Sequence, residues 1–150
     1  MNDNTRRIRT SPVEIARLLA IADRDLGQAS QEVLHLDTRF ALAYNAALQL
    51  ATVILRLDGV RVRKDAFHAR TFAELKERLP EDRRSFAEYF DRARRKRNTA
   101  AYEQSDVVSA GELDDLSEQV NRFREWVEEV LRESEIEHGD PELGRESNGQ

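Results

Sequence analysis

A cluster of basic residues stands out in the second half of the chain, in the stretch RARRKRNTAAYE from Arg92 to Glu103. Five of the six residues from Arg92 to Arg97 are basic, although the 150-residue chain carries a formal net charge of -5. Such a cluster is either a solvated helix face or a site built for an anion such as a phosphate. The position of each basic residue on a helix helps to separate these alternatives.

Arg97 is the member of the cluster that does not fit a solvated face. At 100° per residue it falls on the same helical stripe as three apolar residues, Phe86, Phe90 and Ala93. Arg95 points the opposite way. A guanidinium on an apolar stripe is partly buried and needs an anionic or hydrogen-bonding partner. We therefore expect Arg97 either to form a salt bridge with an acid on another helix or to contact a phosphate in a cleft.

The other basic residues of the cluster are predicted to form a solvated face or the rim of that cleft. In the phosphate-binding interpretation, Arg94, Lys96 and Asn98 lie near the rim. Asn45 is polar on an otherwise apolar helix, where it belongs to a row with Gln49, Thr52 and Arg56. This row either forms the facing wall of the cleft or is the exposed side of its helix.

The residues before the cluster are predicted to form two long helices. Ser11, Pro12 and Glu14 make an N-cap, a first-position proline and a capping-box acid. Apolar residues then recur at steps of three and four from Ile15 to Val33, which is typical of one core-facing stripe. The next helix, from about residue 38 to 58 with a glycine stop after it, is apolar around most of its circumference. That pattern indicates the central helix of a bundle.

Three further helices are predicted after a loop that contains His68. A short helix opens with a second capping box, Thr71 and Glu74, and a long one carries the basic cluster from a start at residues 82–85. The last begins with the capping box of Ser109 and Glu112. No stretch alternates as a strand does. The fold class is therefore all-α, an antiparallel up-down bundle of four long helices plus one short helix.

Composition adds a domain division and excludes some kinds of site. We predict a disordered arm at residues 1–10, the helical bundle at 11–135, and a disordered acidic tail at 136–150. The chain has no cysteine and only three histidines, which are far apart in sequence, so no common zinc spacing is present. We expect no metal and no cofactor. The chain shows neither a membrane-spanning segment nor a signal peptide, so we expect a cytoplasmic protein.

The segment RRKRNTAAY at the end of the predicted penultimate long helix resembles the signature of HEPN domains, the nucleotide-binding domains of higher eukaryotes and prokaryotes. The family pattern is an arginine, usually a polar residue, three further residues and a histidine. Arg97 and Asn98 match the first two positions, and Tyr102 stands where the family has histidine. The segment RFALAYNAALQLATVILRLDGVR also resembles helix two of small bacterial HEPN-like proteins, so the likeness spans about residues 11–132.

The resemblance implies a homodimer in which two copies of the motif meet in a shared, positively charged cleft. Many HEPN domains are metal-independent ribonucleases of toxin-antitoxin or phage-defence systems, and others bind without cleaving. An antitoxin or a nucleotidyltransferase is the kind of partner that the family implies. In some family toxins such a transferase modifies a tyrosine two residues beyond the histidine, which is Gln104 here.

Tyr102 in place of histidine favours binding over cleavage. Metal-free cleavage of RNA needs a base, an acid and a cation for the developing charge, and Arg97 could supply the cation. A tyrosine titrates near ~10 and is a poor base at neutral pH, although it can donate a proton, bind a phosphate or stack on a base. His68 is the histidine that could replace it; a plain surface histidine is the alternative.

We therefore predict an RNA- or nucleotide-binding protein of a bacterial toxin-antitoxin or defence type that binds phosphate through Arg97 in a dimer cleft. One alternative is an active metal-independent ribonuclease that uses Arg97 and Tyr102. The other is a non-catalytic helical interaction module whose acidic tail contacts a basic partner or shields the cleft.

Overall fold

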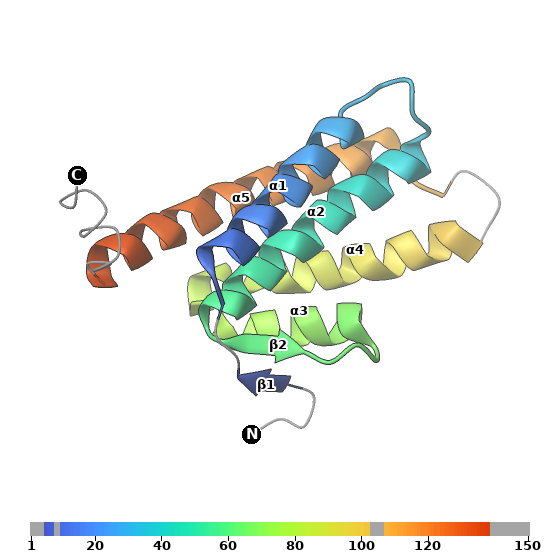
Figure 1. Cartoon of the computed structure of the whole chain (residues 1–150). Coiled ribbons are helices and arrows are strands. Elements are labelled where there is room, and N and C mark those ends of the chain that lie inside the picture. Colours follow the sequence, from blue (N-terminus) through green and yellow to red (C-terminus); the bar gives the residue numbers. More distant parts are fainter. Residues whose placement is uncertain (1–4, 8–9, 103–106, 139–150) are drawn as a thin grey trace, which may run out of the picture.

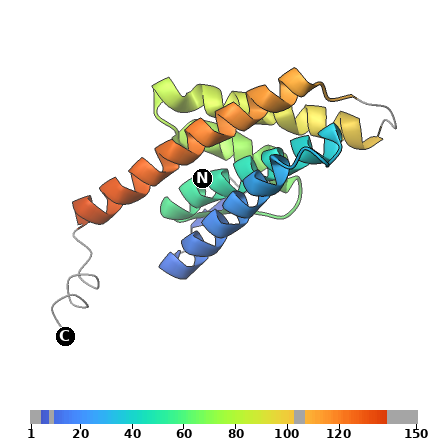
Figure 2. The same ribbon diagram turned by 90° about the horizontal axis from the view of Figure 1, so that it is seen from above.

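The structure is a computed structural model that describes residues 5–7, 10–102 and 107–138, with side chains for 10–101 and 107–134. It is all-α, as predicted, with five helices packed against each other (Figures 1 and 2). The helices are α1 (Pro12–Ala29), α2 (Leu36–Leu57), α3 (Phe67–Arg78), α4 (Arg84–Tyr102) and α5 (Ala110–His138). A one-turn 3-10 helix, η1 (Glu81–Arg83), precedes α4, and two three-residue strands, β1 (Thr5–Arg7) and β2 (Val60–Val62), pair antiparallel.

The central helix is α2, as its apolar circumference predicts. It packs against each of the other four helices, and α1 lies along it in Figure 1. By length and composition α2 could cross a membrane, but most of it is buried inside the bundle. The helix ends where predicted, because Gly59 takes a positive φ of 73° that a residue with a side chain adopts at a cost.

A row of buried aromatic rings connects four helices and holds them in register. Tyr44 on α2 contacts Phe72 on α3 at 5.9 Å between ring centroids, and Phe72 contacts Phe90 on α4 at 6.2 Å. Phe90 in turn lies 5.3 Å from Phe123 on α5, edge to face. All four rings are fully buried. Such pairs contribute about 0.5–1.5 kcal/mol each beyond the burial of their area, so this row fixes α4 relative to α2 and α3.

The start of α1 is capped as predicted, and its acid has a second role. The Ser11 hydroxyl accepts a hydrogen bond of 3.1 Å from the backbone N–H of Glu14. The Glu14 carboxylate binds the guanidinium groups of Arg56 and Arg61, each at 3.0 Å. The first helix is therefore tied to the end of α2 and to β2. The predicted stripe ends too late, however, because α1 stops at Ala29 and Val33 is 91% exposed.

The start of α3 differs from the prediction. The helix begins at Phe67, after Ala66 in the left-handed region with a φ of 53°, and so His68 lies in its first turn and not in a loop. The predicted cap, Thr71, is buried inside the helix and donates its hydroxyl proton to the carbonyl of Phe67 at 2.7 Å. A threonine can be satisfied by the carbonyl four residues earlier, so the same sequence pattern fits a helix interior.

The last helix begins as predicted, and the terminal arms are described only in part. Ser109 and Glu112 form both bonds of the capping box, at 2.9 and 3.1 Å. Within the predicted N-terminal arm, Thr5–Arg7 form β1. Residues 136–138 of the predicted tail continue α5. Residues 139–150 lie outside the described part of the chain.

Candidate functional site

Arg97 lies half-buried on the apolar stripe of α4, as predicted, and its guanidinium faces an aromatic ring. The carbon Cζ is 5.8 Å from the centroid of the Tyr44 ring. A cation over an aromatic face is stabilised by about 0.5–2 kcal/mol, depending on its desolvation. Among the described carboxylates none forms an ion pair with Arg97. The salt bridge that we considered as its structural role is therefore not found in that part of the chain.

Tyr44 connects Arg97 to His68. Its ring is 0% exposed, and its hydroxyl lies 2.9 Å from Nδ1 of His68. The two rings are 5.7 Å apart at their centroids with planes tilted by 36°. Burial raises the pKa of Tyr44 far above its usual value, so the phenol keeps its proton at neutral pH. We call Arg97, Tyr44 and His68 the Tyr44 cluster; it brings together residues from α4, α2 and α3.

The surroundings of His68 favour its neutral form. Burial of the ring lowers its pKa, and the positive charges of Arg97 and Arg94 lower it further. The Nδ1 atom is occupied by Tyr44, whereas Nε2 has no partner in the part of the chain that the structure describes. His68 is half-buried and keeps access to solvent. Its environment, with two cations beside the ring, therefore disfavours protonation at neutral pH.

Three other basic residues of the α4 cluster are ion-paired, whereas Arg92 is exposed and lies over the Tyr89 ring. The Asp91 carboxylate forms ion pairs with Arg94, three residues later at 2.9 Å, and with Arg95, four residues later on the same helix. Burial acts to raise the pKa of Asp91, but the hydrogen bonds from Arg94 and Arg95 outweigh it, and the net pKa lies below the usual range. Lys96 binds Glu112 on α5 at 3.1 Å. The rim is therefore cationic but partly neutralised.

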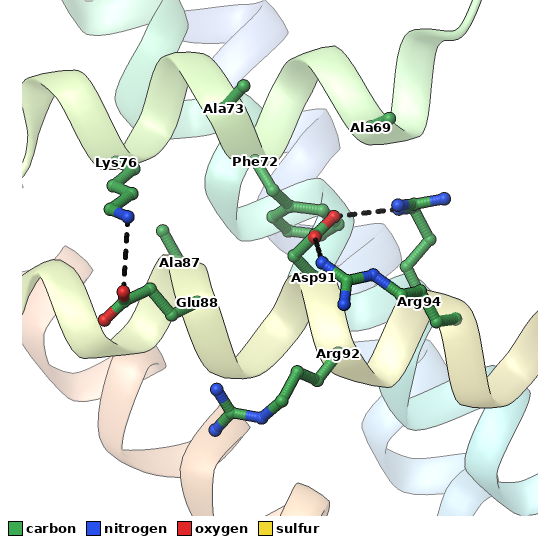
Figure 3. Close-up of a pocket in the computed structure, with 10 residues that line it drawn as sticks. Ala69, Phe72, Ala73, Lys76, Ala87, Glu88, Asp91, Arg92 and Arg94 are labelled. Carbon is green, nitrogen blue, oxygen red and sulfur yellow. Dashed lines mark hydrogen bonds and ion pairs between the residues drawn. The ribbon is translucent and has the colours of Figure 1, made fainter.

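A groove of about 470 Å³ runs between α3 and α4 (Figure 3). Alanines and Phe72 form its apolar lining, and the ion pair of Lys76 with Glu88 lies at one end. Ala69, the neighbour of His68, and Arg94 line it as well. Its volume is within the range of small-molecule sites. None of Arg97, Tyr44 and His68 lines the groove, which adjoins the Tyr44 cluster through Ala69 and Arg94.

Asn45 does not face this site. Its amide donates to the Asp25 carboxylate on α1, and Asp25 is itself buried and bound by Arg24. Both interpretations of the polar row, a cleft wall or an exposed side, are thus wrong for Asn45, because its side chain packs on α1. Arg56, in the same row, binds Glu14 of that helix.

The other two predicted site residues, Asn98 and Tyr102, follow Arg97 on α4. Asn98 is half-buried on α4 directly after Arg97. Tyr102 is the last residue of α4, and its side chain lies outside the described residues. Within those residues no three histidine, aspartate or glutamate side chains come together as a metal site.

Tyr44 was not among the predicted site residues. The sequence feature that could have identified it is a tyrosine inside an otherwise apolar helix, because a buried tyrosine hydroxyl needs a hydrogen-bond partner. His68, 24 residues further along the chain, is that partner.

Comparison with known protein families gives one match. The model of a family described as HEPN-like matches residues 30–128, about two thirds of the chain. This range covers α2, α3, α4 and most of α5, and so includes every residue of the Tyr44 cluster. Neither the curated proteins nor the solved structures gave a match.

Proposed function

Because the chain belongs to the HEPN domain family, we propose that it binds RNA or a nucleotide and that Arg97 contacts a phosphate. HEPN domains are typically ribonucleases or nucleotide-binding domains of defence and toxin-antitoxin systems. The observation that carries the proposal is a half-buried guanidinium that meets an aromatic face and no described carboxylate. Such a group keeps its hydrogen-bond donors for a planar, bidentate acceptor such as a phosphate.

The surroundings of Arg97 support a phosphate ligand. Arg94 and Arg97 both act electrostatically on His68, so two positive charges converge on this side of α4. The groove between α3 and α4 gives a sugar or base of the ligand an apolar place beside the phosphate. Lys96 and Asn98 are the adjacent rim residues. We include a toxin-antitoxin or defence role and a homodimer with a shared cleft in this proposal, on the basis of the family. The expected cytoplasmic location belongs to the proposal as well and rests on the sequence alone.

Salt-dependent binding of a single-stranded RNA oligonucleotide tests the proposal. Each lost phosphate contact makes the slope of log affinity against log salt shallower by roughly 0.7 on single strands. We expect this change for Arg97→Ala and little change for Arg97→Lys, which keeps the charge. Arg122→Ala is the matched control, because Arg122 is exposed on α5 and pairs with Glu118 one turn away. An unchanged slope in Arg97→Ala would contradict the proposal and leave a helical protein-interaction module as the alternative.

Molar mass in solution tests the dimer separately. We expect about twice the chain mass of 17.3 kDa by light scattering. A monomer at the concentrations where RNA binds would exclude the shared cleft and leave Arg97 as a site within one chain. An antitoxin or nucleotidyltransferase partner is implied by the family alone and belongs to the same proposal.

A further inference from the structure

The Tyr44 cluster places an imidazole where the α4 sequence has none. We propose that His68 is the proton acceptor of a ribonuclease site in which Arg97 binds the scissile phosphate and Tyr44 positions the imidazole. This inference rests on the proposed function, because it requires RNA phosphate at Arg97. It assigns the base to α3, where the sequence offers His68 as a replacement, and not to Tyr102 at the end of α4.

The geometry holds the His68 ring on two sides. Its Nδ1 atom is 2.9 Å from the Tyr44 hydroxyl oxygen, and the Phe67 ring lies edge-on at 6.0 Å between centroids. This hydrogen bond can run in either direction, and the proposal requires the tautomer that carries its proton on Nδ1. That tautomer donates the proton to the Tyr44 oxygen and leaves the lone pair of Nε2 free. A hydrogen bond to one ring nitrogen that orients the other is the usual arrangement of a working histidine. Tyr44 itself is a positioning residue, since it is fully buried and cannot touch substrate.

The same tyrosine sets where Arg97 lies relative to His68. Arg97 contacts the face of the Tyr44 ring and His68 contacts its hydroxyl, so one buried side chain supports both functional groups. Tyr44 in turn packs on Phe72, within the aromatic row that fixes α2, α3 and α4. Tyr44 therefore holds both the base, His68, and the phosphate-binding cation, Arg97, in fixed positions. Catalysis requires such preorganised groups.

The charges around His68 suit a base at neutral pH. The groups that face the cluster are Tyr44 on α2 and Asp91, Arg94 and Arg97 on α4. Asp91 is committed to its ion pairs with arginine, so no free carboxylate among the described residues stabilises a protonated imidazole. A neutral histidine accepts a proton far more readily than a tyrosine, whose proton leaves only near ~10.

The chemical step is a transfer of the phosphate ester within the RNA strand. Nε2 of His68 takes the proton of the 2′-hydroxyl, and the 2′-oxygen forms a bond to phosphorus while the bond to the 5′-oxygen breaks. Water gives a proton to the departing 5′-oxygen, and the resulting hydroxide takes the proton from His68. The products are a 2′,3′-cyclic phosphate and a 5′-hydroxyl, and no metal or oxidant enters the balance. Arg97 faces the negative charge that develops on the phosphorus oxygens.

Cleavage and binding of the same RNA sequence separate this inference from the proposed function. General base catalysis contributes about 10²–10⁴-fold, so we expect His68→Gln to lower the cleavage rate at least a hundredfold. Binding of a 2′-O-methylated, uncleavable oligonucleotide should keep its affinity and its Arg97-dependent salt slope in His68→Gln. Tyr44→Phe should lower kcat about tenfold with KM unchanged, because only the orientation of the imidazole is lost. Circular dichroism checks that both variants are folded, and Tyr102→Phe should retain cleavage.

The pH profile of the unmodified protein tests the base without any substitution. The cleavage rate should rise with pH to a midpoint below the usual value of ~6.5 and remain level above it, because the neutral imidazole is the active form. A midpoint near 10 would overturn the assignment in favour of Tyr102. Undiminished cleavage by folded His68→Gln would overturn it as well. Arg97-dependent binding without any cleavage would reject the role of His68 and leave the proposed function standing, and the absence of such binding would reject both.

Discussion

The ion pairs of Glu14 should show how strongly the start of α1 is tied to the end of α2. The Glu14 carboxylate accepts from Arg56 Nε and from Thr10 Oγ1 through one oxygen, and from Arg61 through the other, all at 3.0 Å. The Arg56 side chain is only 8% exposed, and its other bond in the described structure goes to the Val60 carbonyl at 3.3 Å. Glu14→Gln removes the anion and leaves a buried guanidinium with little compensation.

The expected magnitude follows from the burial of the two partners. Removing one partner of a fully buried ion pair costs about 3–5 kcal/mol, because the other charge stays buried. The Glu14 side chain is 31% exposed, so solvent screening reduces this to roughly 2 kcal/mol for Glu14→Gln. Arg56→Met removes the charge together with its need for a partner and should cost about 1 kcal/mol or less. In the double variant, Glu14→Gln should add almost nothing to the effect of Arg56→Met.

Urea unfolding of the four proteins at neutral and acidic pH measures these differences. Burial acts to raise the pKa of Glu14, but the hydrogen bonds from Arg61 and Thr10 and the charge of Arg56 outweigh it, and the folded pKa lies below the usual one. A depressed folded pKa stabilises the protein above the unfolded value near ~4.3, and this contribution is lost as the pH falls through the folded pKa. Glu14→Gln should therefore approach the unmodified protein in strong acid. Additive effects in the double variant, or a larger loss from Arg56→Met than from Glu14→Gln, would refute the reasoning.

Four further predictions concern two glycines, a helix cap and the His68 ring. Gly59→Ala should lower stability by about 1–2 kcal/mol, because Gly59 has a φ of 73°. The same change at Gly27, where an added Cβ meets nothing within 4 Å, should raise stability by about 0.5–1 kcal/mol in thermal melts. Ser109→Ala should cost about 1 kcal/mol in urea melts through loss of the α5 cap, and Ser109→Thr should recover most of it. The folded pKa of His68 is lowered, so stability should fall as pH drops from ~6.5 through that pKa, and His68→Gln should remove this part of the slope.

Local patterns in the sequence predict much of the fold and the position of Arg97. The caps at Ser11 and Ser109 and the stop at Gly59 depend on neighbouring residues only, and all three are confirmed. The stripe of Phe86, Phe90 and Ala93 repeats every three or four residues, so it identified Arg97 as a half-buried cation. These features need no knowledge of which helices are neighbours.

The partners across helices could not be predicted in this way. Asn45 binds Asp25, and nothing local to Asn45 says which neighbouring helix its side will face. Asp25 lies on the apolar stripe of α1, and a buried acid needs a hydrogen-bond donor, so its position could have predicted a polar partner on a neighbouring helix. Likewise, the bond between Tyr44 and His68 forms only because α3 begins before Thr71. It also requires that the first turn of α3 packs against α2 at the level of Tyr44. Sequence patterns within single helices do not carry that information.

Asp91 makes the basic surface of α4 selective about the anions it accepts. Its carboxylate already occupies Arg94 and Arg95, so an incoming anion must displace a ligand that is covalently part of the protein. A freely diffusing small anion gains little from that exchange, because the tethered carboxylate has a high local concentration. A strand that is already held at Arg97 presents its next phosphate to Arg94 and Arg95 at a high local concentration too. The helix thus carries its own competitor, which favours a ligand with several linked phosphates over a single free ion.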